Sequence, residues 1–156
     1  MEKHTMAMQA QQVQDATRVE VRTRFGTLPV PKENLLTFPQ GIPGFDHLYR
    51  FALFHDEDNN SIHYLQSLDD PAVRLPLTSP RWFNIDYQFT LSDEEIRLLD
   101  IEPADEVSVL VVLAEQDEGK PPRLNLHGPI ILNTSKRLGL QKVLNQPRGS
   151  LVISAH

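Results

Sequence analysis

The sequence predicts an all-β fold, mainly antiparallel, in the form of one small β-barrel-like domain with one or two short helices. Short apolar stretches recur along the chain, and turn-forming residues separate them, which is typical of a sandwich or barrel. Twelve prolines are spread through the 156 residues and argue against long helices. The longest apolar runs, such as Val107–Ala114, fall well short of the roughly 20 residues that span a bilayer.

Length and composition favour a single domain. With 40% hydrophobic and 23% charged side chains, the chain can close one core, which we place in residues 17–156. Residues 1–16 are polar and lack the apolar centre of a secretory signal, so we expect a flexible tail. The absence of cysteine excludes disulfides and thiolate metal sites and favours a cytoplasmic protein.

The first predicted element is a half-buried strand over Arg18–Phe25, where apolar or small residues alternate with charged ones. Its inner face would carry Val19, Val21, Thr23 and Phe25. We expect Gly26-Thr27 to turn the chain. Further strands are predicted at Leu35–Phe38, Tyr49–His55, Ser61–Ser67, Val73–Leu77, Glu106–Ala114, Leu124–His127, Pro129–Asn133, Gln141–Asn145 and Leu151–Ser154. The acidic stretch Asp56–Asn60 has the composition of a hairpin loop.

One segment predicts a short helix. Ser92 and Glu95 have the spacing of a capping box, and Leu91 and Ile96 flank them as an apolar staple. The helix should end before Pro103. Its acidic first turn is read as helix stabilisation, because carboxylates favour the positive end of the helix dipole.

Motifs for catalysis and cofactor binding are missing from the sequence. There is no G-x-S-x-G elbow, HExxH pair or Walker-type glycine run, so we predict no enzyme and no cofactor. His55 and His63 flank the acidic loop and could form a divalent-metal site with Asp56 or Asp58. Seven intervening residues do not fix one geometry, however, and we predict no metal.

Charge is distributed unevenly along the chain. Residues 119–156 hold six basic side chains and no acidic one, whereas residues 1–118 sum to −12, with 9 basic and 21 acidic side chains. The basic side chains are Lys120, Arg123, Lys136, Arg137, Lys142 and Arg148. This third could bind nucleic acid or a small ligand, or it could neutralise the acidic part. All eleven aromatic residues lie between Phe25 and Phe89, so the basic third cannot stack bases.

The segment Phe38–Phe45 (FPQGIPGF) combines two prolines, two glycines and three large apolar side chains. In a structural interpretation it is a fixed loop that plugs one end of the sheet. In a functional one it is a stiffened recognition loop, because proline lowers the entropy lost on binding and an apolar anchor supplies the energy. The candidate protein-binding residues are Phe38, Ile42, Pro43 and Phe45.

Four motifs resemble the FliW family of flagellar assembly factors in order and spacing over about residues 19–145. They are FPQGIPGF, LQSLDDP (residues 65–71), DYQFTLSDEE (residues 86–95) and NLHGPIILNTSKRLGLQKVL (residues 125–144). The chain departs from the family pattern at Arg74-Leu75-Pro76, where a more apolar stretch is expected, and in the polar leader and the tail after residue 148.

The resemblance implies a small β-barrel-like fold without cofactor or catalysis. It also implies a cytoplasmic protein that binds flagellin and the RNA-binding translational regulator CsrA, and so relieves repression of flagellin synthesis. We therefore expect a monomer with protein partners, no direct contact with nucleic acid and no membrane association. Ile42, Pro43 and Phe45 are the expected interface, with nearby acidic residues guiding a basic partner.

Overall fold

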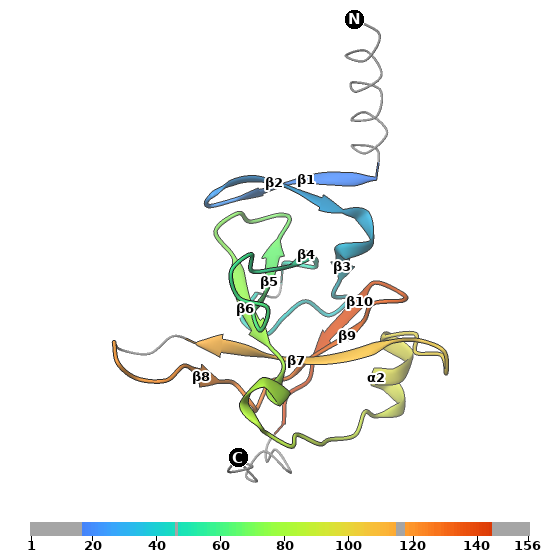
Figure 1. Ribbon diagram of the computed structural model, residues 1–156. Helices are drawn as coiled ribbons and strands as arrows, with labels where there is room; N and C mark the ends of the chain where they lie inside the picture. Colours follow the sequence, from blue (N-terminus) through green and yellow to red (C-terminus); the bar gives the residue numbers. More distant parts are fainter. Residues whose placement is uncertain (1–16, 46, 115–117, 145–156) are drawn as a thin grey trace, which may run out of the picture.

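The computed structural model describes residues 17–45, 47–114 and 118–144 (Figure 1). Seven strands form a closed barrel, which confirms the predicted all-β class. In barrel order they are β6 (Arg74–Thr78), β5 (His63–Ser67), β4 (Arg50–His55), β3 (Leu35–Thr37), β10 (Leu138–Gln141), β9 (Ile130–Asn133) and β7 (Val107–Ala114). Pairing of β6 with β7 closes the ring, and the short β8 (Arg123–Leu124) pairs with the last residues of β7. All described pairs are antiparallel except β3 with β10.

The barrel core draws on almost every strand. Its buried side chains are Leu36, Phe38, Ile42, Leu48, Phe51, Leu65, Leu77, Leu110, Ile130 and Leu132. Because side chains alternate across a strand, the neighbours of these residues point out of the barrel. Two further apolar clusters therefore form on its outer face, and each is covered by a separate segment.

The first outer cluster lies under the hairpin of β1 (Arg18–Thr23) and β2 (Gly26–Pro31), at one end of the molecule (Figure 1). Val21 and Val30 pack on Ala52, which is the outward neighbour of Phe51 on β4. The predicted first strand is thus confirmed as far as Thr23.

The prediction for the end of this strand was wrong. Arg24 and Phe25 form a two-residue turn, and Gly26 already begins β2. The Thr23 hydroxyl stabilises the turn, because it donates to the Gly26 carbonyl at 2.7 Å and accepts from the Phe25 N–H at 3.0 Å. Phe25 consequently leaves the buried face, and 77% of its surface is exposed.

Strand β2 was missed because Pro29 and Pro31 interrupt it. The Lys32 N–H donates to the Thr17 carbonyl at 3.0 Å, which identifies residues 17 and 32 as a hydrogen-bonded pair at the end of the two strands. In an antiparallel pair, the backbone N–H and C=O groups of successive residues point alternately toward and away from the partner strand. Because Lys32 bonds to β1, the backbone groups of Pro29 and Pro31 point away from it. Their missing N–H groups therefore remove no bond between the two strands.

The second outer cluster lies under the helical segment. Leu99, Ile131 and Leu140 are buried there, and Ile131 is the outward residue between two core residues of β9. The helix α2 (Asp93–Leu98) confirms the predicted capping box: the Glu95 N–H donates to Ser92 Oγ and the Ser92 N–H donates to Glu95 Oε1. Two 3-10 turns, η1 (Lys32–Asn34) and η2 (Pro80–Phe83), complete the described helical elements.

The last described strand differs from its prediction. β10 spans Leu138–Gln141, whereas the sequence predicted a strand from Gln141 onward. Arg137 has a positive φ of 57° and ends the turn after β9, so the new strand begins immediately. The strand predicted at Leu151–Ser154 and the tail predicted over residues 1–16 lie outside the described residues. Among the helices that the structure describes, none has the length and apolar character needed to cross a membrane.

Candidate functional site

The loop Phe38–Phe45 consists of two consecutive β-turns. The Gly41 N–H donates to the Phe38 carbonyl at 2.8 Å, and the Phe45 N–H donates to the Ile42 carbonyl at 2.7 Å. A proline occupies the second position of each turn, where its fixed φ is favourable. Gly44 has a φ of +92° at the third position of the second turn, which is the conformation that a type II turn requires.

The structure divides the four predicted interface residues between core and surface. Phe38 and Ile42 are 0% and 2% exposed and belong to the barrel core, and Phe45 packs against that core from a half-buried position. Pro43 is exposed. The structural interpretation of the loop as a plug is therefore confirmed, while its role as an interface stays a prediction. We call residues 38–45 the plug loop.

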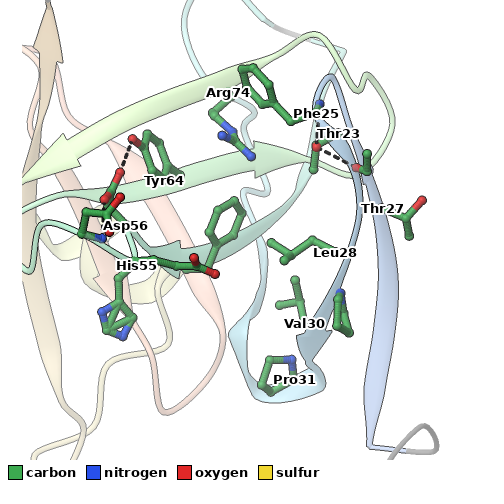
Figure 2. Close-up of a pocket in the computed structure, with 15 residues that line it drawn as sticks. Thr23, Phe25, Thr27, Leu28, Val30, Pro31, His55, Asp56, Tyr64 and Arg74 are labelled. Atoms are coloured by element: carbon green, nitrogen blue, oxygen red, sulfur yellow. Dashed lines mark hydrogen bonds between the residues drawn. The ribbon is translucent and has the colours of Figure 1, made fainter.

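A second surface was not anticipated from the sequence. An open cleft of about 610 Å³ lies between β2 and the end of the β4–β5 hairpin (Figure 2). Its apolar lining comes from Leu28 and Val30 of β2 and from Phe54 of β4. Its charged lining consists of Asp56, Glu57, Asp58 and Arg74. We call it the hairpin cleft.

Three aromatic rings surround the Arg74 guanidinium at the upper side of the cleft in Figure 2. The guanidinium carbon lies 4.8 Å from the ring centre of Tyr64, 5.0 Å from that of Phe25 and 5.1 Å from that of Phe54. These distances are within the range of cation–π attraction. Burial lowers the pKa of Arg74, and Tyr64 and Asp56 partly oppose this effect.

Asp56 is fixed at the start of the acidic loop, where β4 ends. Its carboxylate accepts hydrogen bonds from the Tyr64 hydroxyl at 2.7 Å and from the N–H groups of Asp58 and Asn59 at 2.8 and 3.1 Å. These bonds, that of Tyr64 foremost, lower the pKa of Asp56 below its ordinary value. The carboxylate is consequently ionised at neutral pH, and the predicted hairpin loop at residues 56–60 is confirmed.

The motif LQSLDDP organises the loop beside the cleft. The buried Gln66 donates from Nε2 to the carbonyls of Ser67, Pro71 and Val73, and its Oε1 accepts from Arg74 Nε at 3.2 Å. The Ser67 hydroxyl accepts the N–H groups of Asp69 and Asp70. Gln66 of this motif therefore positions Arg74 through the hydrogen bond to Nε, while the three aromatic rings pack on its guanidinium.

His55 and His63 do come together, as the hairpin allowed. Their rings stack with centres 5.2 Å apart. Burial, followed by the neighbouring His55, lowers the pKa of His63 and favours its neutral form. Within the described ranges, no group of three or more His, Cys, Asp or Glu side chains could hold a metal ion.

Part of the basic last third is paired within the molecule. Lys136 Nζ lies 2.9 Å from the Asp105 carboxylate and 3.4 Å from that of Glu102, and Lys142 Nζ lies 2.6 Å from that of Glu95. Side-chain hydrogen bonding to Lys136 is the main cause that lowers the pKa of Asp105 to about 2. These contacts support the interpretation that basic residues of this third neutralise acidic neighbours.

The hairpin cleft left only weak signals in the sequence. Arg74 departs from the FliW pattern, and it is the residue that the three rings enclose. The alternation of residues 18–25 predicts a buried Phe25, so it gives no sign of the exposed ring. Residues 25, 56 and 74 meet only because the outer hairpin crosses the barrel strands.

Comparisons with known proteins identify the family. The sequence model of the family described as FliW protein matches residues 20–154. The flagellar assembly factor FliW of Azoarcus sp. (strain BH72) is 38% identical over 128 residues, which cover 78% of this chain and 88% of that protein. The flagellar assembly factor FliW 1 of Desulfotalea psychrophila is 38% identical over 131 residues, covering 82% and 92% of the two chains.

The fold leads to the same family. A crystal structure of the flagellar assembly factor FliW superimposes with a TM-score of 0.71 at 29% sequence identity, covering 84% of this chain and 91% of that one. The motifs that suggested the family also have clear structural roles here, because the plug loop closes the core and LQSLDDP positions Arg74. The chain belongs to the FliW family of flagellar assembly factors.

Proposed function

We propose that this protein binds flagellin in the cytoplasm and antagonises a CsrA-type translational regulator, and thereby couples flagellin synthesis to filament assembly. The observation that carries this proposal is membership of the FliW family over nearly the whole described chain. No covalent chemistry is needed. If both partners draw on one limited pool, accumulating flagellin removes the protein from the regulator by mass action, and export of flagellin reverses this.

The plug loop remains the proposed contact region for a partner. Pro43 and the accessible part of Phe45 would touch the partner, while Phe38 and Ile42 hold the loop rigid from within the core. A rigid loop loses little conformational entropy when it binds, so apolar contacts there contribute more fully to affinity. Phe45→Ala and Pro43→Ala test whether the exposed part of the loop contacts the partner. Ile42→Ala tests whether binding requires the buried side chain that holds the loop rigid.

The deciding experiment mixes purified full-length protein with flagellin and with the CsrA-type regulator of the same organism, first in pairs and then all three together. We expect co-elution with each partner in size-exclusion chromatography. In the ternary mixture, excess flagellin should release the regulator. If the protein binds neither flagellin nor the regulator at micromolar concentrations, the proposal is contradicted.

A nucleic-acid-binding or small-ligand-binding function of the basic third is the alternative. Such a protein should retain RNA with a steep salt dependence, or should carry a ligand through purification. The pairing of Lys136 and Lys142 with carboxylates speaks against it, because those cations are already partly neutralised. Absorbance at 260 nm and an RNA titration at two salt concentrations distinguish the two functions.

A further inference from the structure

We infer that the open edge of β7 accepts a further strand, and that its occupant is the segment Leu151–Ser154 of the same chain. This inference is independent of the proposed function, because it concerns how the chain completes its own sheet. Three observations carry it: backbone groups at the start of β7 that no described residue pairs, an apolar groove beside them, and the place where the described chain ends.

The first residues of β7 have a partner strand on one side. The Thr134 N–H donates to the Glu106 carbonyl at 3.3 Å, so the backbone groups of even-numbered residues point to β9. Those of Val107 and Val109 consequently point to the opposite side, where β6 pairs with the later residues of β7. Among the described residues, none pairs with Val107 or Val109 on that side.

Strand β6 stops short of these residues because of a proline. Its last residue, Thr78, pairs with Val111. Continuing this register would place Pro80 opposite Val109, and proline has no N–H with which to extend a ladder. The chain leaves the sheet at this point, in the 3-10 turn η2. The start of β7 is therefore an exposed strand edge within the described chain, and such an edge readily pairs with another strand.

A groove of about 560 Å³ lies along this edge. Residues 107–110 of β7 form one wall. Residues 79–81 and 85–88, which carry the chain away from β6 and back, complete the lining. We call it the edge groove. An added strand would lie in it, beside β7 and in the place that β6 vacates.

The edge groove suits an uncharged apolar strand. Its lining holds one cation and one anion, Arg81 and Asp86, so net charge favours neither sign of ligand. Val107 lines the groove with 38% of its surface exposed, and covering such a side chain is favourable. The segment Leu151–Ser154 (LVIS) has no charged residue, and its valine and isoleucine favour strands.

The described chain ends next to this groove. Its last residue, Leu144, donates from its N–H to the His127 carbonyl at 2.7 Å. The carbonyl of the residue before, Leu126, accepts a hydrogen bond from the Tyr87 hydroxyl, and Tyr87 lines the groove. Burial raises the pKa of Tyr87 to about 12, so the hydroxyl keeps its proton for this bond at neutral pH. The side chain of Tyr87 thus links the groove to the point where the chain continues.

The remaining chain is long enough to reach the edge. Leu151 follows Leu144 by seven residues, and an extended chain advances about 3.3 Å per residue, or about 23 Å in all. A tethered segment also has a high effective concentration, which favours it over a second copy of the chain. Once occupied, the edge cannot accept a strand from another protein, which is a common mode of peptide recognition.

The test measures amide hydrogen exchange of Val107 and Val109 by NMR in the full-length protein. The variants are Val152→Pro and Ile153→Pro. Because the backbone groups of successive strand residues point to opposite sides, one of these prolines must remove an N–H that faces β7. Ser150→Pro is the matched control, since it leaves the segment itself intact.

We expect the amides of Val107 and Val109 in the parent protein to exchange at least about tenfold more slowly than in an unfolded chain. One of the two proline variants should lose this protection, and the control should stay within about twofold of the parent protein. The Ile131 amide, in a strand paired on both sides, should exchange at the parent rate in every variant, which establishes that the variants are folded.

A second measurement identifies the occupant. The chain has no cysteine, so pairs of introduced cysteines report proximity directly. Val107→Cys is combined in turn with a cysteine at each position from 151 to 154. In the control series Glu20→Cys, on the hairpin far from β7 in Figure 1, takes its place. Because side chains alternate across a strand, cross-linking within one chain should alternate along the segment in the Val107→Cys series.

Several results would overturn the inference. Rapid exchange of Val107 and Val109 in the parent protein would show that the edge is open in solution. Protection that survives both proline variants would assign the edge to another segment. Covalent dimers in place of cross-linked monomers would assign it to a second copy, and equal cross-linking in the control series would remove the evidence for docking. None of these results depends on whether the protein binds flagellin or the regulator, so the proposed function is tested separately.

Discussion

The plug loop and the tip of the β1–β2 hairpin both present an aromatic residue at a tight turn, yet they turn it in opposite directions. Phe38 is fully buried, whereas Phe25 has 77% of its surface exposed. Turn chemistry does not explain the difference, because both turns are held by short hydrogen bonds. The space opposite each residue does: Phe38 lies over a glycine of β10, and Phe25 lies over an arginine.

The comparison separates rigidity from exposure. Proline and glycine fix the path of the plug loop, but the path alone does not say which side chains a partner can reach. In the hairpin cleft, by contrast, the accessible groups are charged and aromatic. The neighbouring loop is held by side-chain hydrogen bonds of Gln66 and Ser67 to its backbone. A recognition surface thus needs both a fixed backbone and an outward anchor.

The largest effect should come from Phe38→Ala. Removing a fully buried phenylalanine takes away its apolar transfer energy and leaves a cavity, so we expect a loss of about 3–5 kcal/mol in the free energy of unfolding. Urea denaturation followed by circular dichroism measures it. A loss below about 1 kcal/mol would mean that the plug loop contributes little to the core, and would remove one side of the comparison.

Gly139→Ala should destabilise the protein through the same contact. A Cβ added at residue 139 would lie 2.4 Å from Cζ of Phe38 and within 2.8 Å of two further ring atoms, so the ring must move. Such overpacking typically costs about 1–3 kcal/mol.

A double-mutant cycle tests whether the contact is direct. In the background of Phe38→Leu, whose side chain lacks the ring, Gly139→Ala should cost clearly less than in the parent protein. Equal costs in the two backgrounds would show that the glycine is needed for another reason, such as its own backbone conformation.

The sequence was sufficient for features that depend on neighbours along the chain. Short apolar stretches between turn-forming residues predicted most barrel strands, and the spacing of Ser92 and Glu95 predicted the helix start with its two reciprocal hydrogen bonds. The errors arose where a residue that disfavours strands sits inside one. Pro29 is tolerated because its backbone faces an unpaired edge, and Gly139 is required because a ring occupies the place of its side chain.

The candidate sites depended on contacts between distant segments, which local patterns do not contain. The Phe38 ring occupies the space that Gly139 leaves without a side chain, and Phe25 reaches Arg74 from the outer hairpin at the hairpin cleft. The LQSLDDP motif indicated the family, but its function of holding Arg74 through Gln66 required the folded arrangement.

Acid pH should affect the hairpin cleft and leave the plug loop unchanged. The plug loop contains no ionisable side chain, whereas Asp56 in the cleft has a pKa lowered chiefly by the Tyr64 hydroxyl. A carboxyl group whose pKa is lowered in the folded state stabilises the protein fully above its unfolded pKa of about 3.9, and this contribution disappears as the pH falls through the folded value.

The stability difference between the parent protein and Asp56→Asn should therefore be constant near neutral pH and shrink below about pH 4. The difference for Phe45→Leu, in the plug loop, should change little over the same range. Denaturant unfolding at a series of pH values measures both differences. A pH-independent difference for Asp56→Asn would show that its hydrogen bonds contribute equally in both protonation states.

The smallest effect on stability should come from Phe25→Ala. The ring is mostly exposed, and Arg74 keeps its contacts with Phe54 and Tyr64, so only one exposed cation–π contact is lost. Such a contact contributes about 0.5–1 kcal/mol, several times less than the expected loss for Phe38→Ala in the same denaturation assay. Two phenylalanines at turns of one protein would then differ mainly because one ring faces the core and the other faces an open cleft. A loss approaching that of Phe38→Ala would mean that Phe25 is packed in solution, and the cleft would lose its exposed aromatic residue.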